Sequence, residues 1–236
     1  MTTEEIMSSW VGAEYEIHGD GSVSLLSDFD LRSAVKGLKE FPVSLRTIKK
    51  NVDMSWSETL TTLGGLTTVG GALILRGCPK LTDLGSLRTV RGQLHLGRCP
   101  MLRTLGELQR VGGTLPLYHC PSLTDLGELR ELPYGLDISG CSSLNSLYGV
   151  RLVRRSLSIR GCNSLSSLGD LKFVGELVYH SDDTRQQGST WADFKGMWAG
   201  TLRTLEDTPE QAPMLLVTSP YAWQRALALQ TLNGAR

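Results

Sequence analysis

LTTLGGLTTVGGALILRGCPK, residues 60–80, is the first of five consecutive copies of one 21-residue pattern. The copies follow one another without an insertion, and a sixth begins at Leu165 and fades after Tyr179. Each copy contributes one cysteine, so all five cysteines of the chain stand 21 residues apart, at Cys78, Cys99, Cys120, Cys141 and Cys162. A leucine-rich pattern with a fixed period of this length is typical of a solenoid, in which every copy forms one coil and buries its apolar face against its neighbours.

One copy predicts a short strand followed by a tight return of the chain. Leu73 and Leu75 occupy alternate positions, which indicates a strand with one face directed inward. Cys78 follows as a small inward residue at the turn, and leucines then recur at a spacing of three, which suits a 3₁₀-like or extended return. Too few residues remain for an α-helix. We therefore expect one parallel β-sheet with one strand per coil; a parallel β-helix with more than one sheet is the alternative.

The repeat resembles two kinds of known repeat. The pattern L-x-L-x-x-C-x-x-L resembles cysteine-containing leucine-rich repeats, although it is shorter than most. The glycine-rich form LxxLGxLxxVGGxLxLxxC resembles a short-repeat class of phage and metagenomic bacterial proteins, and HGDGSVSLLSDFDL at 18–31 and LKEFPVSLRTIKKNVDMS at 38–55 resemble its lead-in. The chain departs from that class at Leu87 and Leu108, where the class often has Ala-Pro. The resemblance implies a solenoid and no particular reaction.

Three regions are expected along the chain. Residues 1–38 form an N-terminal cap, with a short helix over 1–13 and a hairpin whose turn is Gly19-Asp20-Gly21. Residues 39–180 form the repeat solenoid of about seven coils, the first of which is degenerate. Residues 181–236 form a helical cap, because Thr208-Pro209 and Ser219-Pro220 are typical helix starts. The expected fold is a solenoid: a leucine-rich-repeat-like coil stack with one parallel β-sheet, a β-rich N-terminal cap and an α-helical C-terminal cap.

The cysteines and glycines provide no catalytic or metal-binding motif. Because the cysteines share one inward position, we expect buried free thiols rather than disulfides. No CxxC pair occurs, and GGLTTVGG at 64–71 lacks the Lys and Ser/Thr of a phosphate-binding loop. We therefore expect no metal site, no cofactor, no catalytic residue and no enzymatic activity.

Charge and composition argue against two classes of partner. The chain has a net charge of zero, although residues 60–180 carry 13 Lys/Arg against 8 Asp/Glu. We do not expect a nucleic-acid partner, because the arginines fall at positions spread around the coil, among them Arg88, Arg103, Arg110, Arg130 and Arg151. No apolar run is long enough to span a bilayer and no signal-peptide pattern occurs. A cytoplasmic protein is the expectation, in the host cytoplasm if the protein is phage-encoded.

The outward face of the predicted strands is the candidate binding surface. Its positions do not serve the core, and they carry tyrosine, arginine and histidine side chains suited to protein interfaces. The candidate binding residues are Arg76, His95, Tyr118, Asp137, Arg160 and Tyr179. The predicted function is a non-enzymatic protein–protein interaction module, and the resemblance implies a phage or bacterial protein that binds a host or partner protein. The alternative is an enzyme or toxin whose chemistry lies in the C-terminal tail, with the solenoid as its targeting device.

Overall fold

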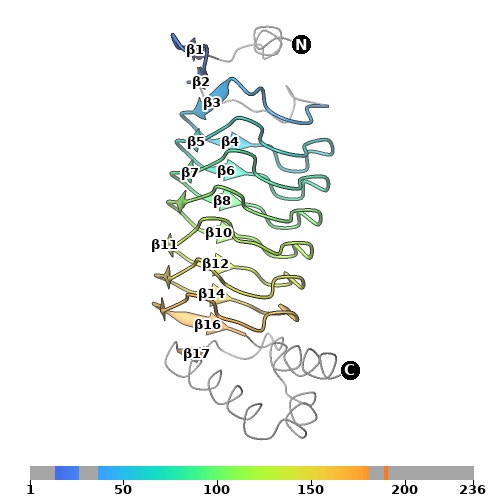
Figure 1. The fold of residues 1–236 in the computed structure, drawn as a ribbon, viewed down its shortest axis with the longest axis vertical. Coiled ribbons are helices and arrows are strands. Elements are labelled where there is room, and N and C mark those ends of the chain that lie inside the picture. Colours follow the sequence, from blue (N-terminus) through green and yellow to red (C-terminus); the bar gives the residue numbers. More distant parts are fainter. Residues whose placement is uncertain (1–13, 27–36, 181–188, 191–236) are drawn as a thin grey trace, which may run out of the picture.

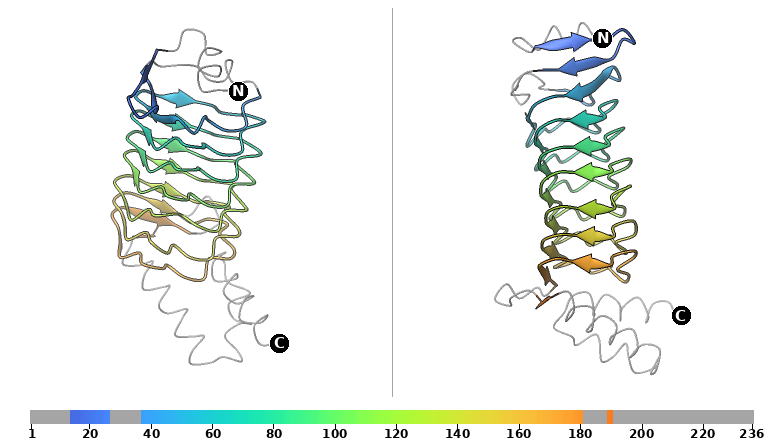
Figure 2. Two further views of the ribbon diagram at one scale, coloured as in Figure 1. Left: turned by 45° about the horizontal axis from the view of Figure 1, so that its top comes forward. Right: turned by 90° about the vertical axis from the view of Figure 1, so that its left-hand side faces the viewer.

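The chain winds into a stack of seven coils, each of which carries two short strands (Figure 1). The structure is a computed structural model that describes residues 14–26, 37–180 and 189–190. We divide each coil into three walls: the first wall is residues 44–50, the second 51–58 and the third 59–64, with copies of each at 21-residue steps. The coils follow one another along a single axis, and the two strand-bearing walls run its length (Figure 2).

Strands occupy the first and second walls and pair in parallel between coils. The first wall holds β3 (Leu45–Ile48), β5 (Thr68–Val69), β7 (Thr89–Val90), β9 (Arg110–Val111), β11 (Glu131–Leu132), β13 (Leu152–Val153) and β15 (Phe173–Val174). The second wall holds β4 (Val52–Asp53), β6 (Leu73–Ile74), β8 (Leu94–His95), β10 (Leu115–Pro116), β12 (Leu136–Asp137), β14 (Leu157–Ser158) and β16 (Leu177–Tyr179). Paired strands keep the 21-residue register, as Leu73 opposite Leu94 shows.

The expectation of stacked parallel strands is confirmed, but the expectation of one sheet with one strand per coil is wrong. The strand at Leu73 lies on the second wall, and Thr68 and Val69 form another strand on the first wall. Val69 and Leu73 are both buried, and the Gly70-Gly71 corner turns the chain between them. The third wall is linked by two isolated bridges among the described residues. The fold is therefore the alternative, a parallel β-solenoid with strands on more than one wall.

Each ladder is interrupted once, and a proline stands at each interruption. In the first-wall ladder Gly112 N donates to Val90 O at 2.8 Å. Pro133 stands at the same position one coil later and has no N–H, so the sheet ends at β9 and resumes at β11. Pro116 breaks the second-wall ladder between β8 and β10 in the same way, although its carbonyl still accepts from Leu96 N at 2.9 Å.

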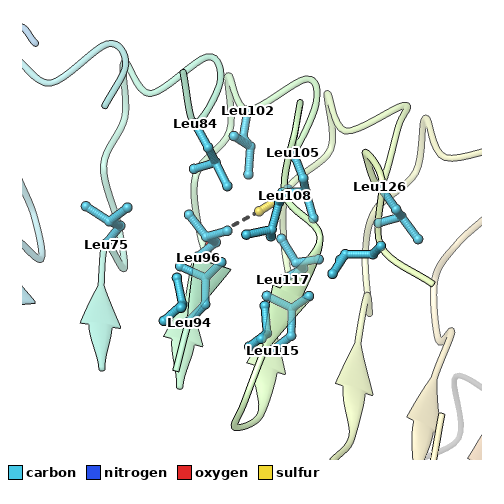
Figure 3. Packing of buried hydrophobic residues seen from close by; sticks show 14 of the residues in the cluster. Leu75, Leu84, Leu94, Leu96, Leu102, Leu105, Leu108, Leu115, Leu117 and Leu126 are labelled. Carbon is cyan, nitrogen blue, oxygen red and sulfur yellow. Dashed lines mark hydrogen bonds between the residues drawn. The ribbon is translucent and has the colours of Figure 1, made fainter. Parts of the chain in front are cut away.

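Columns of leucine and valine fill the interior between the walls. Figure 3 shows leucines of neighbouring coils packed together in this interior. The repeat positions expected to point inward are fully buried, among them Val69, Leu73, Leu75, Leu81, Leu84 and Leu87. The degenerate first coil joins the same core, because Leu45, Ile48, Val52 and Met54 are buried as expected. One apolar core thus runs through all the coils, which is how a solenoid is stabilised.

The five cysteines are buried and free, as expected, and their thiols connect the coils. Cys120 Sγ donates to the carbonyl of Leu96 in the preceding coil at 3.2 Å, and the dashed line in Figure 3 joins a sulfur atom to Leu96. Each of the other four thiols makes the equivalent bond to the residue 24 positions earlier. The neighbouring Cys141 thiol and burial raise the pKa of Cys120, so this side chain remains a protonated donor.

Short strands add to both ends of the stack. The expected hairpin is present: β1 (Tyr15–Ile17) pairs antiparallel with β2 (Val23–Leu25), which pairs in parallel with β3. At the other end β17 (Ser189–Thr190) pairs antiparallel with β16. The expected helix over 1–13 and the helices expected after residue 190 lie outside the described residues. No helix occurs in residues 14–26, 37–180 or 189–190, so a membrane-crossing helix is also absent from these ranges.

Candidate functional site

The outward side of the second wall, here called the second-wall face, carries all six candidate binding residues. Two columns make up this face. The central column is Asp53, Ile74, His95, Pro116, Asp137, Ser158 and Tyr179, and the second is Ser55, Arg76, Gly97, Tyr118, Ser139 and Arg160. The six candidates are all half-buried, and five of them, all except Asp137, contact a side chain of a neighbouring coil. Three groups of contacts follow along the axis.

The first group joins Trp56 to Arg76. The Arg76 guanidinium lies 5.6 Å from the centre of the Trp56 ring, in a cation–π contact. Trp56 has a φ of +64° and stands where later coils have Gly77, Gly140 and Gly161. A Cβ on Gly77 would overlap the Trp56 ring, so the missing side chain leaves room for the indole. Trp56 remains 56% exposed, which leaves part of its ring available to a partner.

The second group joins His95 to Tyr118. His95 Nε2 and Tyr118 Oη lie 3.2 Å apart, and the two rings are tilted by 60°. Tyr118 also meets His119 edge-on, with ring centres 5.9 Å apart. A Cβ on Gly97 would lie 2.7 Å from the Tyr118 ring, so the tyrosine reaches across the preceding coil only because glycine stands there. These contacts hold the Tyr118 ring against the face.

The third group forms an open groove of about 480 Å³ over the last four coils. Its walls include Pro116, Tyr118, Asp137, Arg160 and Tyr179, so the structure brings four of the six candidate residues together in it. The Arg160 guanidinium lies 5.0 Å from the centre of the Tyr179 ring. Arg76 and His95 lie in earlier coils on the same face and do not line the groove.

A hydroxyl and carboxylate network lies between the aromatic sides of the groove. Asp137 Oδ1 accepts from Ser139 N at 3.0 Å and from Ser139 Oγ at 2.6 Å. Ser139 Oγ and Ser158 Oγ lie 2.7 Å apart, which connects two adjacent coils. The groove therefore presents hydrogen-bonding atoms at fixed positions between Tyr118 and Tyr179.

The two arginines of the face have donors that the solenoid leaves unused. The Nε atoms of Arg76 and Arg160 are buried and have no hydrogen-bond partner among the described residues. Neither guanidinium takes part in an ion pair within the part of the chain that the structure describes. A buried N–H without a partner is unfavourable. Because each guanidinium is stacked on a ring, the plane of its donors is fixed.

Histidines beside these arginines are held in the neutral form. Burial and the Arg76 charge lower the pKa of His95, while burial and the Arg160 charge lower the pKa of His180. The positive charge of the face at neutral pH is therefore carried by the arginines. Protonation of His95 would place a second positive charge near Arg76.

Several residues of the site were not chosen from the sequence. Trp56, Pro116 and Ser158 are not among the six residues that the sequence indicated. The sequence did contain an indication for Trp56, because later coils have glycine at the same repeat position at Gly77, Gly140 and Gly161. A large side chain at such a position must point away from the turn. The contact of Tyr118 with Gly97 had a similar signal, a glycine in an outward column of larger residues.

The described residues contain no group of three or more His, Cys, Asp or Glu side chains that could hold a metal ion. The sulfur atoms lie in the core and the carboxylates on the surface, so the two kinds of ligand do not meet. Searches of family models, curated proteins and solved structures return no match for this chain. The geometry of the second-wall face is therefore the basis on which a function can be inferred.

Proposed function

We propose that this protein is a non-enzymatic interaction module that binds a protein partner through the second-wall face. The groove around Tyr118 and Arg160 is the observation that carries this proposal. Tyrosine, tryptophan and arginine contribute most of the energy at many protein interfaces. Here their rings and guanidinium groups are already held by contacts between coils, so a partner would order few side chains on binding.

The chemistry of the groove favours a partner segment that carries a carboxylate beside an apolar side chain. The carboxylate would bind the Arg160 guanidinium, which takes part in no ion pair within the described ranges. The apolar side chain would pack between Tyr118 and Pro116, which line the same groove. Asp137 and the serines beside it would accept and donate hydrogen bonds to the partner backbone. The repeat resemblance favours a bacterial protein as this partner.

A pull-down with paired variants tests the proposal. Tyr118→Ala and Arg160→Ala should each abolish recovery of a protein that the wild-type chain retains from a bacterial lysate. The matched controls are Met101→Ala and Arg103→Ala, which remove an exposed apolar side chain and an exposed arginine from the third wall. Urea unfolding of all four variants separates a lost contact from a lost fold. Recovery of the same protein by both groove variants, or its loss from both controls as well, contradicts the proposal.

The alternative function places catalytic chemistry in the C-terminal tail. The residues that would carry it lie after residue 190, outside the described residues. The groove variants also separate the two hypotheses, because a catalytic tail would not require Tyr118 and Arg160 for the recovery of a partner.

A further inference from the structure

The positive charge of the solenoid is gathered on the first wall. Residues 39–180 carry 17 Lys/Arg and 11 Asp/Glu. The first wall holds 11 of the basic and 5 of the acidic residues, and the other two walls together hold 6 basic and 6 acidic residues. The whole net charge of +6 therefore lies on the first wall. All eleven basic side chains of this wall are exposed. The arginines do not spread around the coil as expected: Arg88, Arg110, Arg130 and Arg151 share this wall, and Arg103 alone of that set lies elsewhere.

Part of this charge is neutralised locally, and part is not. Arg88 pairs with Glu107 at 2.8 Å, and two further first-wall arginines pair with glutamates at 3.4 and 3.9 Å. Within the described ranges no ion pair involves Arg110, Arg130 or Arg151. These residues lie on successive coils, which are separated by about 4.8 Å per strand. Arg130 and Arg151 share one repeat position, and Arg110 stands one position later in its coil. A row of available cationic donors thus runs along the solenoid axis.

Grooves lie on both sides of this row at Arg110. One groove is lined by Arg46, Arg88 and Arg110 together with threonine and serine residues, Gln109 and Glu107, the glutamate that pairs with Arg88. The other is lined by Arg91 and Arg110 together with Glu131 and Pro133 from the following coil. Guanidinium groups beside hydroxyl donors suit the oxygens of phosphate groups.

Exposed aromatic rings stand beside the same row in the last coils. Tyr148 is 75% exposed at the corner that leads into the first wall, and Phe173 is 49% exposed on β15. Phe173 lies directly opposite Leu152 in the neighbouring coil, and Arg151 precedes Leu152. Exposed rings among basic side chains are the combination that binds single-stranded nucleic acid, because bases stack on the rings while phosphates meet the cations.

We propose that the first wall binds single-stranded nucleic acid, with phosphates on Arg110, Arg130 and Arg151 and bases stacked on Tyr148 and Phe173. The proposal is independent of protein binding at the second-wall face, because the residues involved lie on different walls. Duplex DNA fits this wall less well, since its bases are already stacked and paired. Polyphosphate could use the arginines, but it has no bases for the rings.

Fluorescence anisotropy with a labelled single-stranded DNA oligonucleotide tests this proposal. The full chain should bind it at low salt, and the affinity should fall as salt rises. A triple variant, Arg110→Gln, Arg130→Gln and Arg151→Gln, should bind at least about tenfold more weakly and reduce the salt slope by about 2, from roughly 0.7 per lost phosphate contact. The matched control is Lys39→Gln, Lys80→Gln and Arg103→Gln, which removes the same charge from exposed third-wall positions and should bind like wild type.

The aromatic half of the proposal has its own readout. Tyr148→Ala and Phe173→Ala should each weaken binding by about fivefold or more without changing the salt slope, because stacking is not an ionic contact. Trp56→Gly, which removes an exposed ring from the second wall at a φ that glycine adopts readily, should bind normally. Three outcomes overturn the proposal: no binding at low salt, equal weakening by the two triple variants, or equally strong competition by duplex DNA or inorganic polyphosphate.

Discussion

Three glycine substitutions measure how strictly the coils are stacked. Gly127 has a φ of +67°, and a Cβ built there would lie 2.5 Å from the backbone oxygen of Gly106 in the preceding coil. Gly106 has a similar φ of +57°, but its Cβ would meet Gly85 O at an ordinary 3.5 Å. Gly19 lies in the N-terminal hairpin turn without a positive φ and would meet nothing within 4 Å. The three sites thus separate backbone strain from collision between coils.

The expected costs follow from these geometries. Gly106→Ala should destabilise by about 1–2 kcal/mol, the cost of the left-handed conformation for a residue with a Cβ. Gly127→Ala should add about 1–3 kcal/mol for overpacking, because the colliding atom belongs to a backbone that is hydrogen-bonded into its own coil. Gly19→Ala should be neutral or stabilise by up to about 1 kcal/mol through the unfolded chain.

Urea unfolding, with the midpoint and the slope fitted separately, provides the free energies. The order of stability should be Gly19→Ala, then Gly106→Ala, then Gly127→Ala, with an unchanged slope. Equal costs at Gly106 and Gly127 would refute the reasoning, because they would mean that adjacent coils separate freely at this corner.

Two further predictions concern the core and the histidines. Cys120→Ala should lower the free energy of unfolding by about 1 kcal/mol, because it removes one buried sulfur atom and its hydrogen bond to Leu96. The control Ser143→Ala, on the exposed surface, should lower it by less than about 0.5 kcal/mol. Rapid labelling of native Cys120 by a thiol reagent would contradict its burial. The lowered pKa values of His95 and His180 stabilise the fold above the unfolded-state pKa of about 6.5, and this contribution should be lost as the pH falls through their folded-state pKa values. A variant with His95→Gln and His180→Gln should therefore lose less of its free energy of unfolding than wild type when the pH falls from about 7 to about 5. Urea titrations at the two pH values measure this difference. An equal loss in the variant and the wild type would show that these rings do not sense pH.

The repeat predicted the coil and its core because both depend on the period. An inward residue in one copy meets its equivalent in the next, so Leu73, Leu75 and Cys78 could be placed before the structure was known. The first-wall strand was missed because Thr68 and Val69 contribute only one buried residue per coil and show no alternation. That strand is formed by hydrogen bonds between coils, which a pattern within one copy does not show.

The candidate site was predictable to the extent that alternation separates inward from outward residues. All six candidates lie on one face for this reason. The contacts among them depend on side chains that cross from one coil to the next, as Tyr118 does over Gly97. The gathering of arginines on the first wall was missed for a related reason, because assigning Arg88 and Arg110 to a wall requires the corner at Gly70-Gly71 to be recognised.

Site-specific photo-crosslinking tests the central claim, that the second-wall face is the protein-binding surface. Thr114 lines the groove and is exposed, and Ser143 is exposed on the third wall, so a photoreactive amino acid at either position leaves the core intact. With the partner recovered by the pull-down, the reactive group at Thr114 should form a covalent adduct and the one at Ser143 should not. An adduct from Ser143 alone, or equal adducts from both positions, would contradict the claim.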